Sequence, residues 1–172
     1  MIEAKPSVRP ATRNDLDEIN QIYNQYVAET HYTFDLDPMS NASRLEWFSH
    51  YSESGPHRLL VALLGERVAG YACSSRYRPK EGYLTSVETS VYLAPAASGL
   101  GLGSQLYEAL FASIRNEDVH RAYAGIALPN PASIALHQKF GFRQVAHFTE
   151  QGRKLGRYWD VAWFEKPLQK TA

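Results

Sequence analysis

The chain has 172 residues, of which 44% are hydrophobic, and its 18 basic and 18 acidic residues give a formal net charge of zero. This length predicts one domain over residues 1–172, with an ordered core at about 7–168. A neutral chain without long runs of one charge argues against nucleic acid or an anionic membrane as the main partner. No apolar stretch is long enough to span a bilayer, and the opening residues MIEAKP lack a secretory signal. A single cysteine excludes an internal disulfide, so a cytoplasmic location is expected.

Apolar residues recur at helical or strand spacing along most of the chain, which predicts its secondary structure. Thr12 and Asp15 form a capping-box pattern before the first helix, and Gly65-Glu66 is a two-residue hairpin signal between two strands. The helices are predicted at residues 13–28, 43–52, 102–116 and 132–140. The strands are predicted near Val8 and at residues 58–64, 68–77, 86–93, 122–127, 143–151 and 157–166, the last two joined by a turn at 152–156.

This order of elements predicts a mixed α/β fold with helices flanking a central, mostly antiparallel sheet. One parallel β-α-β crossover joins the strands at residues 86–93 and 122–127. The irregular, aromatic segment at residues 31–35 is expected to form a wall of the substrate site. Open sheets bind ligands beyond the carboxyl ends of their central strands, so we expect the main site at the loop after residue 93.

That loop is rich in glycine and leads directly into a helix. Gly99, Gly101 and Gly103 alternate in it. Glycine lets backbone N–H groups approach an anion closely, and the helix N-terminus adds free N–H groups and a positive dipole end. The loop lacks the Gly-Lys-Ser/Thr sequence of a mononucleotide site, and it does not fit the dinucleotide pattern G-x-G-x-x-G. A phosphate-bearing cofactor is therefore predicted, and a glycine-rich turn without a ligand is the alternative.

Glu88 is an acidic residue in the middle of the predicted central strand. The two-residue period places it on the same face as Ser90 and Tyr92. A carboxylate in such a position is costly unless it is paired or faces a cavity. It therefore forms either a structural ion pair with Arg76 or Arg78, or a general base that takes a proton from an amine.

Further along the chain, Asn130 precedes a proline at the start of a predicted helix, which is a capping pattern. His137 lies on that helix and either faces the same cleft or is a structural histidine. Cys73 is predicted to be a buried, inert thiol. The six histidines show no metal-ligand spacing, so no metal site is predicted.

The sequence SGLGLG at residues 98–103 resembles the acetyl-CoA pyrophosphate motif of the GNAT superfamily of N-acetyltransferases, Q/R-x-x-G-x-G/A. Asn130, Ser133 and the closing Phe-Gly-Phe at residues 140–142 resemble the second cofactor-side motif of the same superfamily. Similarity to its phosphinothricin and methionine sulfoximine acetyltransferase branch rests on residues 77–79, 85–92 and 152–157. The resemblance covers residues 8–168 and implies a GNAT-like fold.

The resemblance implies acetyl-CoA as co-substrate and a role for each matching residue. It implies that Glu88 is the general base, and that His137 stands where many members have the tyrosine that protonates the departing thiolate. Arg78 is implied to bind an acidic group of the substrate, and Phe34 to line an aromatic pocket. A strand N–H near Tyr92 is expected to stabilise the oxyanion. The implied cofactor-binding residues are Val91, Tyr92, Leu93, Gly99, Leu100, Gly101, Leu102, Gly103, Ser104, Asn130 and Ser133.

The chain departs from the family pattern around both ligands. Ser98 replaces the usual Arg or Gln, and Leu100 replaces a frequently basic residue, so backbone N–H groups are left to hold the phosphates. The branch commonly has Arg, His, and His or Asp at three positions that are expected to flank Glu88 in the acceptor pocket. Here these positions hold Leu84, Thr85 and Thr89.

The implied reaction moves an acetyl group to the α-amine of a small amino-acid-like molecule, such as phosphinothricin or methionine sulfoximine, which would confer herbicide resistance. Two alternatives stay open: a peptide or protein N-acetyltransferase, and a CoA-binding module without catalysis. The resemblance also implies a homodimer, and the aromatic strand with Tyr158, Trp159 and Trp163 is a candidate for the shared surface.

Overall fold

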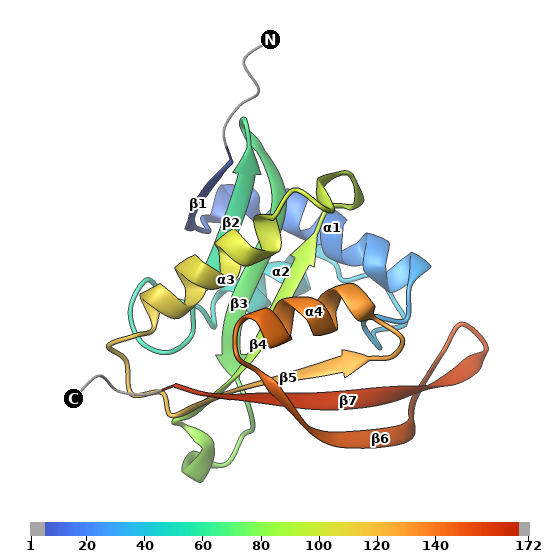
Figure 1. Cartoon of the computed structure of the whole chain (residues 1–172). Helices are drawn as coiled ribbons and strands as arrows, with labels where there is room; N and C mark the ends of the chain where they lie inside the picture. The colour runs from blue at the N-terminus through green and yellow to red at the C-terminus, as the bar shows by residue number, and fades with distance from the viewer. Residues whose placement is uncertain (1–5, 169–172) are drawn as a thin grey trace.

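The computed structural model describes residues 6–168, which form a seven-stranded sheet with helices on both faces (Figure 1). Residues 1–5, on which the expectation about a signal partly rests, lie outside the described residues. The strands are β1 (Ser7–Pro10), β2 (Leu59–Leu64), β3 (Arg67–Arg76), β4 (Ser86–Leu93), β5 (Arg121–Ala127), β6 (Arg143–Lys154) and β7 (Arg157–Pro167). The helices are α1 (Leu16–Glu29), α2 (Asn41–Phe48), α3 (Leu102–Ser113) and α4 (Pro131–Lys139).

The strand order is β1-β2-β3-β4-β5-β7-β6. Every neighbouring pair is antiparallel except β4 and β5, which are parallel and are connected through α3. This confirms the predicted mixed α/β fold with a single parallel crossover. β4 therefore lies at the centre of the sheet, and the glycine loop follows its carboxyl end.

The helices divide between the two faces of the sheet, as Figure 1 shows, with α3 and α4 on one face and α1 and α2 on the other. On the first face, Leu102, Leu106 and Leu110 of α3 are fully buried. On the second, Ile19 of α1 packs against Val61 of β2, and both are fully buried. Burial of such a side chain stabilises the fold by about 1.5–3 kcal/mol. Among the described residues, no helix combines the length and apolar character needed to cross a membrane.

Local capping explains where the helix boundaries differ from the prediction. The capping box is present, with the Thr12 N–H donating to Asp15 Oδ2 at 2.7 Å. α2 begins two residues earlier than predicted because the Ser40 hydroxyl accepts the N–H of Ser43 at 3.1 Å. Three short 3-10 turns were not predicted; they lie at Arg13–Asp15, Glu81–Tyr83 and Pro95–Ala97.

Of the two predicted hairpin turns, one is confirmed and the other is shorter than predicted. Gly65-Glu66 is confirmed as a two-residue turn, since Leu64 pairs with Arg67. The turn predicted at 152–156 is wrong in extent: it contains only Leu155 and Gly156, both with positive φ, and β6 continues to residue 154. Gly152 lies within β6, where it leaves room for an aromatic ring.

Candidate active site

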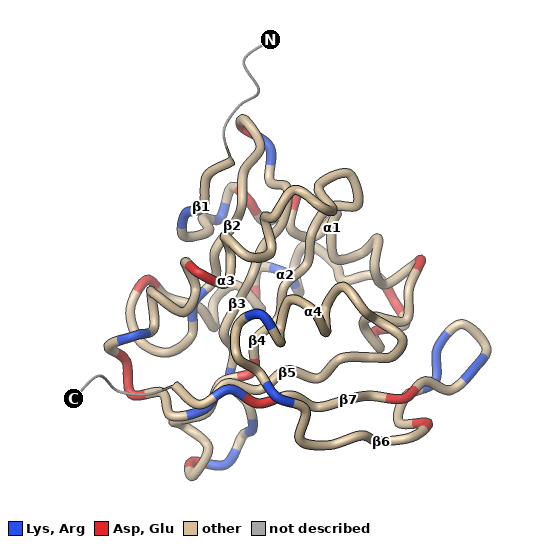
Figure 2. Tube along the Cα trace, in the orientation of Figure 1, with Lys and Arg blue, Asp and Glu red and all other residues tan. Residues whose placement is uncertain are grey.

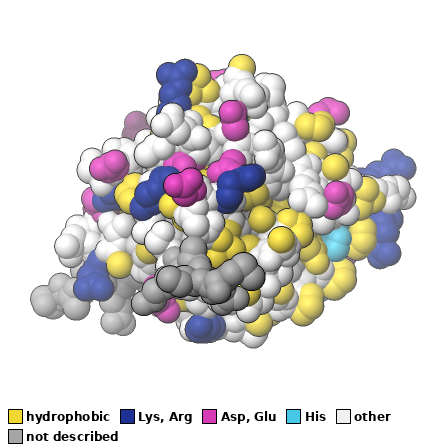
Figure 3. All heavy atoms as spheres, turned by 90° about the horizontal axis from the view of Figure 1, so that it is seen from above, with side chains coloured by type: hydrophobic (Ala, Val, Ile, Leu, Met, Phe, Trp, Pro, Cys, Tyr) yellow, Lys and Arg dark blue, Asp and Glu magenta, His cyan; other side chains and the backbone are white. Residues whose placement is uncertain are grey.

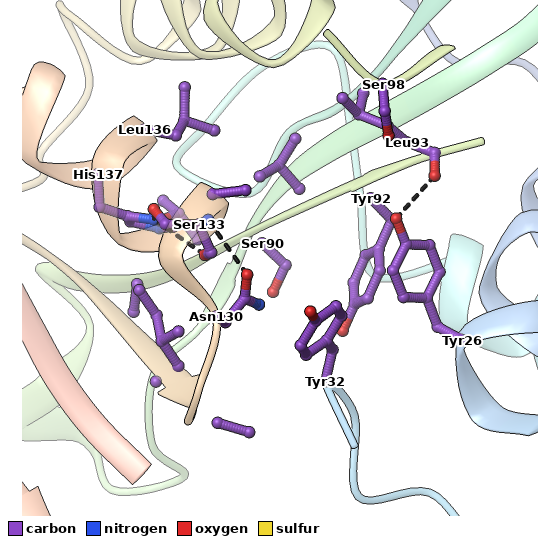
Figure 4. Close-up of a pocket in the computed structure, with 17 residues that line it drawn as sticks. Tyr26, Tyr32, Ser90, Tyr92, Leu93, Ser98, Asn130, Ser133, Leu136 and His137 are labelled. Carbon is purple, nitrogen blue, oxygen red and sulfur yellow. Dashed lines mark hydrogen bonds between the residues drawn. The ribbon is translucent and has the colours of Figure 1, made fainter. Parts of the chain in front are cut away.

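A split between β4 and β5 forms the centre of the site. The two strands pair over three residues only, and Glu88 with Tyr123 is the last pair. Beyond it the strands diverge around a cavity of about 340 Å³. Residues of both strands line this cavity, and so do residues of α1 and α4 (Figure 4). A small-molecule ligand can therefore enter between two strands at the centre of the sheet.

Strand alternation decides which backbone groups face the split. The Ala94 N–H bonds to the Ala69 carbonyl of β3 at 2.8 Å, so every second residue of β4, including Tyr92, turns its N–H and C=O toward β3. The backbone groups of Val91 and Leu93 consequently point into the split. The Leu93 carbonyl already accepts a hydrogen bond from the Tyr26 hydroxyl at 2.8 Å (Figure 4).

These directions support the expected pairing of Val91 and Leu93 with an extended ligand arm, and they refine the expectation about Tyr92. Its backbone belongs to the β3 ladder, and its ring lines the cavity. The N–H groups that face the split at this point of the strand are those of Val91 and Leu93.

The glycine loop has the conformation of an anion cradle. Gly99 and Gly101 have φ values of 79° and 74°, which only glycine adopts readily, and Gly101 caps α3. The N–H groups of Ser104 and Gln105 bond back to the Gly101 carbonyl. Those of Leu102 and Gly103 precede them in the first turn, where no intrahelical acceptor exists. This geometry fits a phosphate group. It also explains why glycine stands at positions 99 and 101, since both need a positive φ.

Glu88 occupies the apex of the split. Its side chain is half-buried, and among residues 6–168 it takes part in no ion pair. Burial raises the pKa of the Glu88 carboxyl, while the positive charge of Arg78 opposes that rise. The Arg76 guanidinium donates to the backbone carbonyls of Arg78 and Pro79. The ion-pair interpretation of Glu88 thus finds no support, and a carboxylate with a raised pKa is available as a base.

Arg78 lies on the Glu88 side of the sheet. Its guanidinium is 4.9 Å from the centre of the Tyr77 ring, which in turn stacks on Tyr123 at 4.3 Å. Tyr123 is the register partner of Glu88 on β5. Arg78 is exposed at the surface and does not line the cavity, so the structure places it beside the approach to Glu88.

Phe34 packs against the β6–β7 hairpin. A side-chain Cβ on Gly152 would lie 2.5 Å from the Phe34 ring, so glycine is needed there. The neighbouring Thr33 carbonyl accepts a hydrogen bond from Lys154 Nζ at 2.8 Å. Lys154 is only 5% exposed, and burial lowers the pKa of its amine. Sequence reasoning missed Lys154 because it assigned this residue to the turn.

His137 lines the cavity and is 3% exposed (Figure 4). Its Nδ1 lies 2.7 Å from the Ser133 carbonyl oxygen, so Nδ1 carries the proton, and Nε2 lies 2.8 Å from the Tyr107 hydroxyl. Burial lowers the pKa of His137, which keeps the ring neutral near pH 7. The histidine is therefore both a cavity residue and a structural one.

The expectation that Thr89 flanks Glu88 in the acceptor pocket is wrong. Its side chain lies on the opposite face of β4, where Thr89 Oγ1 is 3.3 Å from the Tyr107 hydroxyl of α3, although the residue still lines the cavity. Leu84 is 53% exposed in the turn before β4. The aromatic residues found beside Glu88 are Tyr123, its register partner on β5, and Tyr77, which stacks on Tyr123.

Asn130 caps a helix as predicted, and it also lies on the cavity wall. Its Oδ1 accepts the Ser133 N–H at 3.2 Å at the start of α4. Cys73 is buried as predicted, and burial raises the pKa of its thiol. Within residues 6–168, no three His, Cys, Asp or Glu side chains come together as a metal site.

Two tyrosines complete the wall of the cavity: Tyr32 belongs to the aromatic segment predicted at residues 31–35, whereas sequence reasoning missed Tyr26. Tyr26 and Tyr32 line it from the α1 side, facing the carboxyl end of β4 (Figure 4). Tyr26 has the helical spacing of a core residue, and nothing in the sequence distinguishes it from its buried neighbours. Only the packing of α1 across β4 brings its hydroxyl to the Leu93 carbonyl.

The fold and the split define the class of protein. The profile of the acetyltransferase (GNAT) family matches residues 17–142, and the chain belongs to this family. The phosphinothricin N-acetyltransferase of Streptomyces coelicolor is 53% identical over 167 residues, covering 96% of this chain and 98% of the relative. The methionine sulfoximine/methionine sulfone acetyltransferase of Pseudomonas aeruginosa is 35% identical, with 96% of both chains covered. A phosphinothricin acetyltransferase from Sinorhizobium meliloti, solved with acetyl-CoA, superposes with a TM-score of 0.90 at 33% identity, covering 95% of this chain and 88% of that one.

Proposed function

We propose that this protein is an acetyl-CoA-dependent N-acetyltransferase that acetylates the α-amine of a small amino-acid-like substrate of the phosphinothricin and methionine sulfoximine type. The observation that carries this proposal is the half-buried Glu88, without an ion-pair partner among the described residues, at the apex of a strand split into which the backbone groups of Val91 and Leu93 point. The names of the relatives support the choice of substrate class.

Acetyl-CoA fits the site in two places. The Gly99–Ser104 loop would hold its diphosphate through backbone N–H groups and the N-terminus of α3. Val91 and Leu93 would pair with the amides of its pantetheine arm across the split, beside Asn130 and Ser133 of α4. Bound in this way, the cofactor supplies a thioester carbonyl near Glu88.

Glu88 is proposed to act as the general base. An α-ammonium group cannot attack, because its nitrogen lone pair holds a proton at neutral pH. The Glu88 carboxylate takes that proton, and the free amine forms a bond to the thioester carbonyl carbon. The Val91 or Leu93 N–H stabilises the negative charge that develops on the carbonyl oxygen. The bond between carbon and sulfur then breaks, and the thiolate departs.

For the departing thiolate we keep His137 as the proton donor. Its support is its position on the cavity wall. The attacking nitrogen must lose a second proton as the amide forms, and His137, which is neutral at rest, would take up this proton and pass it to the thiolate, because burial lowers the pKa of its imidazolium. Its neutral form returns to the bonds with Ser133 and Tyr107.

The acceptor is proposed to carry an acidic group besides its amine. Arg78 lies on the Glu88 side of the sheet with an exposed guanidinium, and Phe34 packs on Gly152 of β6. Figure 2 shows further basic residues at the tip of the β6–β7 hairpin, whereas Figure 3 shows charges of both signs interspersed on the face seen from above. Small acidic amino acids fit this arrangement better than a nucleic acid or a membrane surface.

The test is release of free CoA from acetyl-CoA against a panel of amines. The panel contains phosphinothricin, methionine sulfoximine, methionine sulfone, the common amino acids and a few peptides. Strong release with the first three compounds, lost in Glu88→Gln, is the expected result. Release only with peptides would favour a peptide N-acetyltransferase, and binding of acetyl-CoA without release would favour a non-catalytic module.

We further propose a single domain over residues 1–172, a cytoplasmic location and a homodimer. β6 is an edge strand with Val145 and Phe148 exposed, and Tyr158 of β7 is exposed beside it. Trp159 instead stacks on His31, and Trp163 covers Gly125, so both serve the fold of one subunit. A monomeric mass in light scattering would overturn the dimer, and Phe148→Ser is expected to weaken it.

A further inference from the structure

The anion cradle contains no basic side chain of its own. Between Ala94 and Ser104 the chain carries no Lys, Arg or His. CoA has three phosphate groups, two in its diphosphate and one on its ribose. Partial charges from a helix N-terminus, about half a unit of charge, offset only a small part of this negative charge. A full positive charge close to the loop would therefore add a contact that backbone groups cannot supply.

Lys139 reaches the cradle from a different helix. It is the last residue of α4, and its Nζ donates to the hydroxyl of Ser104, in the first turn of α3, at 2.7 Å. The side chain is exposed, and among the described residues it takes part in no ion pair. Its charge is thus held beside the phosphate loop without a carboxylate to neutralise it.

Close packing of the two helices explains this placement. A Cβ on Gly103 would lie only 3.2 Å from Leu136 Cδ2, so glycine lets α4 approach the start of α3. Lys139 follows Leu136 by three residues and therefore projects from the same face of α4. Gly103 therefore differs from Gly99 and Gly101. Its φ is helical, and glycine is favoured there because it lets the two helices pack closely.

We propose that Lys139 is a cofactor-binding residue that supplies the ionic contact to the phosphates of CoA, in place of the basic residues absent at Ser98 and Leu100. Lysine donates from a flexible stem, so Nζ can keep its bond to Ser104 while a second proton faces a phosphate oxygen. The inference rests on the proposed use of acetyl-CoA.

The test is calorimetric binding of CoA to the full chain in the absence of an acceptor. Lys139→Gln is expected to weaken binding about tenfold, because a charge-assisted hydrogen bond is lost, and to reduce the salt dependence of the dissociation constant. Lys80→Gln removes one exposed charge from the segment before β4, and Arg13→Gln removes one exposed charge from the 3-10 turn before α1. Both controls are expected to bind CoA within about twofold of the wild type.

Dephospho-CoA, which lacks the ribose phosphate, distinguishes the two phosphate sources. An equal loss in Lys139→Gln for both ligands assigns the contact to the diphosphate, and a loss for CoA alone assigns it to the ribose phosphate. Unchanged binding of both ligands, or an equal loss in Lys80→Gln, would overturn the ionic role of Lys139. Failure of the wild type to bind CoA at all would instead refute the proposed function.

Discussion

Substitution of Glu88 by Gln tests the chemistry most directly, because it removes the charge and keeps the shape. General base catalysis contributes about 10²–10⁴-fold, so kcat should fall by that factor, which corresponds to about 3–5 kcal/mol of transition-state stabilisation. The dissociation constant for CoA should stay unchanged, since the carboxylate lies at the apex of the split and not at the phosphate loop. Steady-state kinetics and calorimetry measure the two quantities.

The pH dependence follows from the direction of the pKa shift. Burial raises the pKa of Glu88, so wild-type kcat/KM should fall on the acid side at a pH above the usual range of a glutamate. Glu88→Gln should lack this limb. A folded-state pKa above the unfolded value means that the protonated group stabilises the fold at low pH, and that this contribution is lost as pH rises through the folded pKa. At pH 7 the variant should therefore be at least as stable as the wild type.

Glu117→Gln is the matched control. Glu117 accepts bonds from Arg58 at 2.6 Å and from the Gly55 N–H at 2.9 Å, so its loss should cost about 1–3 kcal/mol of stability without changing kcat. A Glu88→Gln protein that keeps its turnover and melts at a lower temperature would return Glu88 to a structural role and refute the reasoning.

Three further variants address the loop, the acceptor side and the core. Gly101→Ala should lower the free energy of unfolding by about 1–2 kcal/mol through strain at φ 74°, and it should bind CoA more weakly in calorimetry. Gly55→Ala is the control, because Gly55 has a φ of 81° in open space away from the site. It should lose a similar amount of stability and bind CoA normally. Gly152→Ala should displace Phe34 and raise the acceptor KM several-fold, while an unchanged KM would remove Phe34 from the acceptor pocket. Tyr107→Phe removes the hydroxyl that bonds to His137 Nε2, so denaturant unfolding should show a loss of about 1–3 kcal/mol; full stability would mean that this bond contributes nothing.

The sequence by itself determined the order of the elements, the anion loop and the candidate base. Periodicity identifies an amphipathic helix or a strand from a short window of sequence. The hairpin turn at Gly65-Glu66 is also a local feature, because it depends only on the backbone conformation of its own two residues. Gly99 and Gly101 could be read as an anion loop because backbone conformation is a property of the residue itself. Glu88 was identifiable because a charged residue in an apolar strand demands an explanation.

Only the tertiary structure decided which residues meet across elements. Lys139 reaches Ser104, Tyr26 reaches Leu93 and Lys154 reaches Thr33 over long sequence separations, and none of these contacts leaves a local pattern. The two-residue period already put Thr89 on the face opposite Glu88, but only the packing of the helices decided that α3 covers that face. Side-chain contacts between distant segments follow from how the helices and hairpins pack on the sheet, and that packing is a property of the whole chain and not of any one window of it.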